Sequence, residues 1–141
     1  MIDFALHNGD LAIGEKGYIT VSGPAKVAQD LGVAVREPMG CDRFHPRWGS
    51  ILPEFVGSPI GLLTETAIRN EVARLVANYI ANQNEMLRAD VNARRRPRFS
   101  TGEVIERLES IEVRQQYDLF RVRAVVRTLA GDRVEAVRTL R

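Results

Sequence analysis

The feature that most constrains the fold is a long stretch of helical periodicity in the middle of the chain. Apolar side chains recur there at spacings of three and four residues, namely Ile68, Val72, Leu75, Val76, Tyr79, Ile80, Met86 and Leu87. This spacing places them on one side of an α-helix, and Arg69, Asn70 and Arg74 make the other side polar. We predict one long amphipathic helix on the surface of a core.

The sequence also predicts where this helix begins and ends. Ser58-Pro59 provides a cap and a first helical position. Pro97 closes the helix because the residue before a proline disfavours the helical conformation.

Three segments after the helix alternate apolar and polar residues, as half-buried β-strands do. They start at Ile111, Phe120 and Val134, and Gly131-Asp132 predicts a tight turn between the last two. We expect a three-stranded antiparallel sheet between Ile111 and Leu140, with the long helix covering its apolar face.

The N-terminal half predicts a hairpin over residues 10–23 and then a short helix. Gly14 to Gly17 form the hairpin turn, Ser22 or Gly23 caps the helix, and the helix ends before Pro38. The predicted fold class is therefore α+β: hairpin, short helix, ordered loop, long helix and sheet, in one domain spanning residues 1–141.

The loop between the two helices, residues 37–58, lacks periodicity but carries Phe44, Trp48, Leu52 and Phe55. A structureless loop of that length is unusual in a compact domain, so these side chains are expected to anchor it. We also expect a buried, inert thiol at Cys41.

Composition excludes several classes of protein. A single cysteine rules out an intrachain disulfide framework, and no Cys/His spacing fits a zinc site. The sequence shows neither a signal peptide nor a membrane-spanning stretch, so we expect synthesis in the cytoplasm and no membrane partner.

An enzyme is not expected. Glu37, Asp42 and Glu54 lie in the ordered loop, but glycosidic cleavage needs two carboxyl groups placed across a cleft, which spacing in a loop does not establish. Pairing of Glu37 and Asp42 with neighbouring arginines is the favoured interpretation. His7 and His45 belong to no nucleophile motif, and no phosphate-binding loop is present, so no catalytic residue, metal or cofactor is assigned.

The basic run Arg94 to Arg98 and a pI near 9.0 permit contact with phosphates. No nucleic-acid-binding motif accompanies the run, and Phe99 is its only adjacent aromatic residue. A solvated or protein-facing linker is favoured, and nucleic acid is not an expected partner.

The predicted sheet offers edges on which another chain could add a strand. Arg121, Arg123 and Arg127 point outward on it, and Val134 and Val137 belong to its last strand. These residues are candidates for partner binding; a charged edge that only maintains solubility is the alternative.

Several segments, taken in order, resemble the short baseplate wedge proteins of contractile phage tails, also called sheath initiators and sometimes tail-lysozyme-like proteins. They are Gly9-Asp10-Leu11, Val21-Ser22-Gly23, Val27-Ala28-Gln29-Asp30-Leu31, Glu37-Pro38-Met39-Gly40 and Arg47-Trp48-Gly49-Ser50 with Leu52 two positions later, followed by the long helix and terminal strands. The family motif at the turn resembles Glu-Pro-Arg; Glu37 and Pro38 match it, and Met39 replaces the arginine.

The resemblance implies a non-enzymatic virion component of the tail baseplate. Such a protein joins the wedge bundle around the hub and initiates sheath polymerisation by accepting sheath strands on its C-terminal sheet. The implied partners are the sheath subunit, other wedge proteins and central hub or tube proteins, with Glu37 and Pro38 added to the candidate partner-binding residues. A type VI secretion or other contractile injection system, and a tail-associated lysozyme, are the alternatives.

Overall fold

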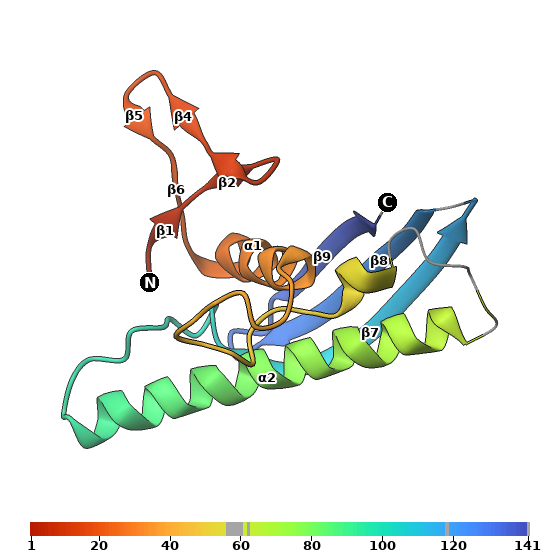
Figure 1. Ribbon diagram of the computed structural model, residues 1–141. Coiled ribbons are helices and arrows are strands. Elements are labelled where there is room, and N and C mark those ends of the chain that lie inside the picture. Colours follow the sequence, from red (N-terminus) through yellow and green to blue (C-terminus); the bar gives the residue numbers. More distant parts are fainter. Residues whose placement is uncertain (56–60, 62, 118, 141) are drawn as a thin grey trace.

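The structure is a computed structural model that describes residues 1–55, 61, 63–117 and 119–140. Two helices, α1 (Gly23–Arg36) and α2 (Thr64–Asn92), precede a sheet of β7 (Ile105–Gln116), β8 (Leu119–Thr128) and β9 (Arg133–Leu140). Both helices cover the same side of that sheet (Figure 1). The predicted α+β architecture, with a long helix packed on a C-terminal three-stranded sheet, is confirmed.

The sheet is an antiparallel meander in the order β7-β8-β9. Gly131, with φ of 88°, makes the turn between β8 and β9, as predicted. The first strand starts at Ile105, earlier than the predicted Ile111. Register shifts occur between Ile105 and Arg107 and between Leu108 and Ser110. They interrupt the alternation of apolar and polar residues, so the sequence pattern does not predict this part of β7.

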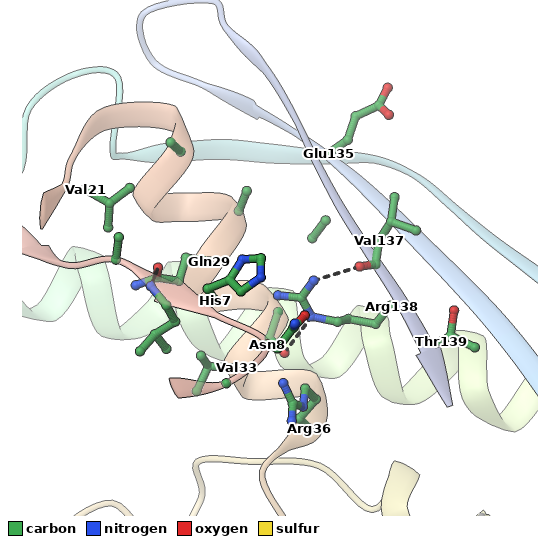
Figure 2. A pocket seen from close by; sticks show the side chains of 17 residues that line it. His7, Asn8, Val21, Gln29, Val33, Arg36, Glu135, Val137, Arg138 and Thr139 are labelled. Carbon is green, nitrogen blue, oxygen red and sulfur yellow. Dashed lines mark hydrogen bonds between the residues drawn. The ribbon is translucent and has the colours of Figure 1, made fainter. Parts of the chain in front are cut away.

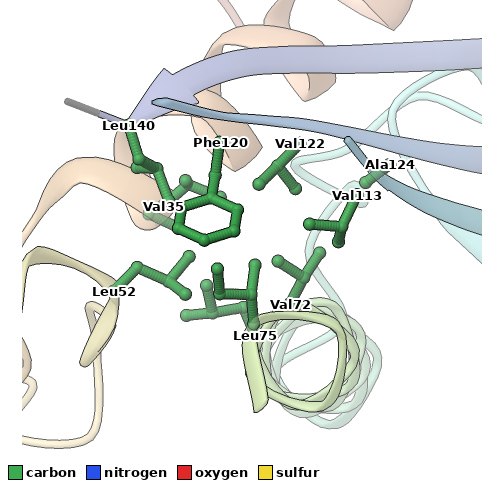
Figure 3. Packing of buried hydrophobic residues seen from close by; sticks show 11 residues of the cluster. Val35, Leu52, Val72, Leu75, Val113, Phe120, Val122, Ala124 and Leu140 are labelled. Atoms are coloured by element: carbon green, nitrogen blue, oxygen red, sulfur yellow. The ribbon is translucent and has the colours of Figure 1, made fainter. Parts of the chain in front are cut away.

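The core lies between the helices and the sheet. Phe120, Val122, Ala124 and Val126 alternate along β8 and all point toward the helices, where α1 contributes Val35. Figure 3 shows Phe120 between Val35, Leu52 and Leu75 in the first part of this core. Because β8 is the central strand and contributes its whole inner face, the sheet and helices stabilise one another.

The long helix matches its predicted pattern over its first half. Ile68, Val72, Leu75, Val76 and Tyr79 are buried, whereas Met86 is exposed. Beyond Tyr79 the buried positions are polar: the Gln83 amide donates to the Glu103 carbonyl and accepts from the Ile105 N–H, and the Asp90 carboxylate binds Arg98. The predicted start at Ser58-Pro59 lies outside the described residues.

The loop after α1 is ordered around Trp48 and Leu52, as expected. Leu52 is fully buried in the short 3-10 helix η1 (Leu52–Phe55), and Trp48 packs against both parts of the core. Two expectations are wrong. Phe44 is 86% exposed and anchors nothing, and Cys41 is exposed because it lies in the same outward turn.

An N-terminal arm precedes α1. It consists of six two-residue strands: β1 (Asp3–Phe4) pairs with β6 (Thr20–Val21), β2 (Leu6–His7) with β3 (Asp10–Leu11), and β4 (Ile13–Gly14) with β5 (Gly17–Tyr18). The predicted hairpin corresponds to β4 and β5. The arm rises above α1, away from the sheet (Figure 1).

Candidate protein-binding edge and groove

The strand β9 forms one edge of the sheet. Residues opposite one another in an antiparallel pair alternate between those that exchange backbone hydrogen bonds and those that do not. The Thr128 N–H donates to the Asp132 carbonyl at 3.0 Å, so Val134 and every second residue after it bond to β8. The backbone N–H and C=O groups of Glu135, Val137 and Thr139 therefore point away from the sheet.

A groove of about 660 Å³ follows this edge. Its walls are β9, the outer side of α1 and the turn between β2 and β3 in the N-terminal arm (Figure 2). The Gln29 side chain holds the arm against α1, since it accepts from the Leu6 N–H and donates to the Phe4 carbonyl. An added strand would thus have its backbone partners on one side and a formed wall on the other.

Arg138 is the unusual residue of this groove. It alternates with the buried residues Val134, Ala136 and Leu140, so its side chain starts on the helix-facing side of β9. Its guanidinium lies against Gly32 of α1, with Nε donating to the Gly32 carbonyl at 3.3 Å. Burial lowers the pKa of Arg138, and the nearby positive charge of Arg36 lowers it further.

The predicted partner-binding arginines lie elsewhere. Arg121, Arg123 and Arg127 are on β8, which is paired on both sides, so none of them is on an edge. Arg123 binds Glu135 at 2.6 Å and Glu112 at 3.4 Å, and Arg127 binds Glu109 at 2.5 Å. These ion pairs form a charge network that covers the outer face of the sheet.

The two candidate valines differ. Val134 is a core residue whose backbone is bonded to β8, whereas Val137 is half-buried and directs its backbone groups into the groove. Only Val137 is placed to pair with an added strand.

Glu37 and Pro38 lie in the turn after α1. The Glu37 carboxylate accepts from the Trp48 indole N–H, and Pro38 forms a parallel bridge with Ser50. Asp42 accepts from the His45 ring and from the Phe44 N–H. The expected pairing of Glu37 and Asp42 with neighbouring arginines is therefore wrong, because indole and imidazole groups occupy both carboxylates.

The N-terminal arm is a second candidate surface, and its first hairpin was not predicted from the sequence. It exposes large apolar side chains, with Ile13 at 71% and Tyr18 at 59%. Asn8 and Gly9 both have positive φ in the turn joining β2 and β3. Asn-Gly is a strong hairpin signal, and it would have identified this part of the arm.

Features of a catalytic centre are not found among the described residues. Wherever the pKa of a described Asp or Glu departs from its usual value, it is lowered, as for Asp42 through its hydrogen bond from His45. No group of His, Cys, Asp and Glu residues in this part of the chain could hold a metal ion. None of the described helices is long and apolar enough to cross a membrane.

Comparison with known proteins gives a match of fold. No family model matches the chain, and no curated protein does. The chain is similar to the crystal structure of a protein from Geobacter sulfurreducens described as a proposed tail lysozyme. The TM-score is 0.58 and the identity 17%, with 86% of this chain and 94% of that chain covered. The similarity shows a shared fold.

Proposed function

We propose that this protein is a structural component of a contractile phage tail baseplate and that it initiates sheath polymerisation by accepting a strand of the sheath subunit along β9. The observation that carries the proposal is the outer edge of β9, which pairs with no further described strand and whose outward N–H groups at Glu135, Val137 and Thr139 line a groove. The fold match to a protein described as a proposed tail lysozyme supports the same context.

The remaining surfaces fit further contacts in such an assembly. Exposed apolar side chains on a protruding arm mark a protein-binding surface, and Ile13, Tyr18 and Ile19 provide one. We assign the β4–β5 hairpin of this arm to neighbouring wedge proteins or to the hub, because it projects away from the sheet (Figure 1). The turn of Glu37 and Pro38 adds a rigid contact point, since Trp48 and Ser50 hold it in place.

A lysozyme activity is the competing function, and the residues disfavour it. A glycosidase needs one carboxyl group kept protonated by its surroundings. Asp42 shares a pocket with Asp30 and His45, but its hydrogen bond from His45 lowers its pKa. Asp30 accepts from Lys26 and from the Tyr79 hydroxyl, which commits it to the packing of α1 against α2. We therefore assign no catalytic role.

Co-purification with the sheath subunit from the same gene cluster tests the proposal. Removing the chain from Ile111 onward would delete the core residues Val113, Phe120 and Val122, so truncation would unfold the protein. Val137→Pro is sharper, because it removes one outward N–H while the ladder to β8 remains. Val137→Thr retains that N–H and serves as the matched control.

We expect the sheath subunit to be retained by the unaltered chain and by Val137→Thr, and lost with Val137→Pro. Equal retention by all three proteins would exclude strand addition at β9. The same experiment with the sheath-like subunit of a type VI secretion system, or of another contractile injection system, would show to which of these assemblies the protein belongs.

A further inference from the structure

Two guanidinium groups in the β9 groove have no acidic partner among the described residues. Arg36, in the last turn of α1, and Arg138 both line the groove, and neither forms an ion pair with a described carboxylate. Glu135 lines the groove too, but it is bound to Arg123. Arg123, Arg127 and Arg133 of the sheet are paired with glutamates, whereas the two groove arginines are not paired with any described carboxylate, so the groove concentrates positive charge.

Each of the two side chains lies against a glycine. Arg138 lies over Gly32, where the absence of a side chain leaves room for the guanidinium, and it donates to the carbonyls of Gly32 and Val137. Arg36 lies against Gly9, so close that a Cβ there would be 3.0 Å from its terminal nitrogens. Figure 2 shows Arg36 and Arg138 on the same side of β9, with Asn8 between them in this view.

We propose that Arg36 and Arg138 form a carboxylate-recognition site, and that the strand accepted by β9 carries an Asp or Glu side chain on its helix-facing side. Planar guanidinium groups bind carboxylates in well-defined geometry. The requirement for an extended peptide comes from the outward backbone groups of Val137 and Thr139 in the same groove. This inference rests on the proposed function, since it specifies the chemistry of the accepted strand.

The position of the acidic residue follows from the geometry of a sheet. Residues opposite each other on paired strands direct their side chains to the same face. Arg138 points to the helix-facing side, so the carboxylate must point there as well. On the outer face, an acidic side chain of the added strand would instead lie beside Glu135, whose carboxylate already binds Arg123.

Nuclear magnetic resonance titration of the isotopically labelled full chain tests this with two blocked peptides of alternating valine and threonine. One carries a central aspartate and its twin carries asparagine. We expect the aspartate peptide to shift the amides of Val137 and Thr139 and the Arg138 side-chain N–H saturably. The asparagine twin should bind at least about tenfold more weakly, because a charge-assisted hydrogen bond is lost.

Two variants distinguish recognition of the carboxylate by Arg138 from a general effect of the protein's positive charge. Arg138→Gln should remove the preference for aspartate, and Arg96→Gln, an equal loss of charge far from the groove, should leave it intact. If Arg138→Gln does not fold, Gly32→Ala tests the same point by displacing the guanidinium. Equal affinity for the two peptides, or no shift in the groove with either, overturns the proposal. Inorganic phosphate reproducing the shifts with the aspartate peptide's affinity would overturn it too, by assigning a small-anion site.

The sheath subunit distinguishes this inference from the proposed function. Retention lost with Val137→Pro and also with the double variant Arg36→Gln/Arg138→Gln supports both. Retention lost with Val137→Pro alone leaves strand addition standing and overturns carboxylate recognition. No retention by the unaltered chain removes the proposed function, whereas a preference for the aspartate peptide would still support the site.

Discussion

Arg138 of β9 rests on Gly32 of α1, at a position where any side chain would displace it. A Cβ at Gly32 would lie 2.1 Å from a terminal nitrogen of Arg138 and 2.5 Å from its central carbon. The atoms that would collide are the far end of a flexible side chain, so the arginine can move into solvent without unfolding the protein. The contact therefore fixes the direction of Arg138 more than it fixes the fold.

Gly32→Ala should consequently change stability little. The substitution gains about 1 kcal/mol of helix propensity and loses the packing of Arg138 on α1. We expect a free energy of unfolding within about 1 kcal/mol of the unaltered protein, measured by urea denaturation. A loss of several kcal/mol would mean that the guanidinium is part of the core.

Gly49 provides the opposite case. It has φ of 89°, and a Cβ there would lie 2.6 Å from the Pro38 carbonyl oxygen and 2.7 Å from that of Glu37, both of which are backbone atoms. We expect Gly49→Ala to destabilise the protein by more than the roughly 1–2 kcal/mol that the left-handed conformation alone costs. Gly131→Ala is the control, because its φ is 88° and no atom lies within 4 Å of the added Cβ. Equal effects of the two substitutions in thermal unfolding would contradict the clash at Gly49.

Much of the fold was predictable because periodicity reports burial. The apolar positions of α2 from Ile68 to Tyr79, and the alternating apolar residues of β8, are those that face the core. Their spacing in the sequence therefore predicted both elements. The groove was not predictable, because it depends on which strand is central. Arg121, Arg123 and Arg127 alternate as edge residues would, and only the pairing of β8 with both β7 and β9 places them inside the sheet.

Arg138 illustrates a second limit. In the sequence it occupies a core-facing position of a strand, and an isolated charge there reads as an interruption of the pattern. Its environment depends on Gly32, which is 106 positions away in the chain. The pattern of side chains along β9 contains no information on Gly32 of α1, whose lack of a side chain makes room for the guanidinium.

Leu52 links the ordered loop to the core, and its removal should be costly. It is fully buried and packs with residues of both helices and the sheet. We expect Leu52→Ala to lower the free energy of unfolding by about 2–5 kcal/mol. Phe44→Ala, in the same loop but 86% exposed, should change it by less than about 0.5 kcal/mol. Urea denaturation of both variants checks this, and comparable losses would mean that the loop packs differently.

Glu103 should make the free energy of unfolding depend on pH in the acidic range. Burial alone would raise its pKa, but donors from the amino group of Met1, from Ser100 and from Gly23 lower it from 4.5 to about 2. The unfolded chain therefore takes up this proton first as pH falls. The stabilisation is complete above about pH 4.5 and is lost as pH falls toward 2.

Glu103→Gln should accordingly be less stable at neutral pH and show a flatter dependence of unfolding free energy on pH between about 4.5 and 2. Urea denaturation across that range measures the slope. Glu106→Gln, an exposed neighbour, should keep the slope of the unaltered protein. An unchanged slope in Glu103→Gln would show that the other carboxylates dominate acid unfolding.

Hydrogen exchange should show the accepting edge amide by amide. Val134, Ala136 and Arg138 donate to β8, so their amides should exchange slowly, whereas the amides of Val137 and Thr139 face the groove and should exchange fast. Addition of a sheath strand would slow only the second set, because each new ladder bond protects an outward amide. This alternation of protected amides distinguishes strand addition from docking on a face of the sheet, which would not protect the amides of β9 with a period of two. Uniform protection along β9 before any partner is added would contradict the free edge.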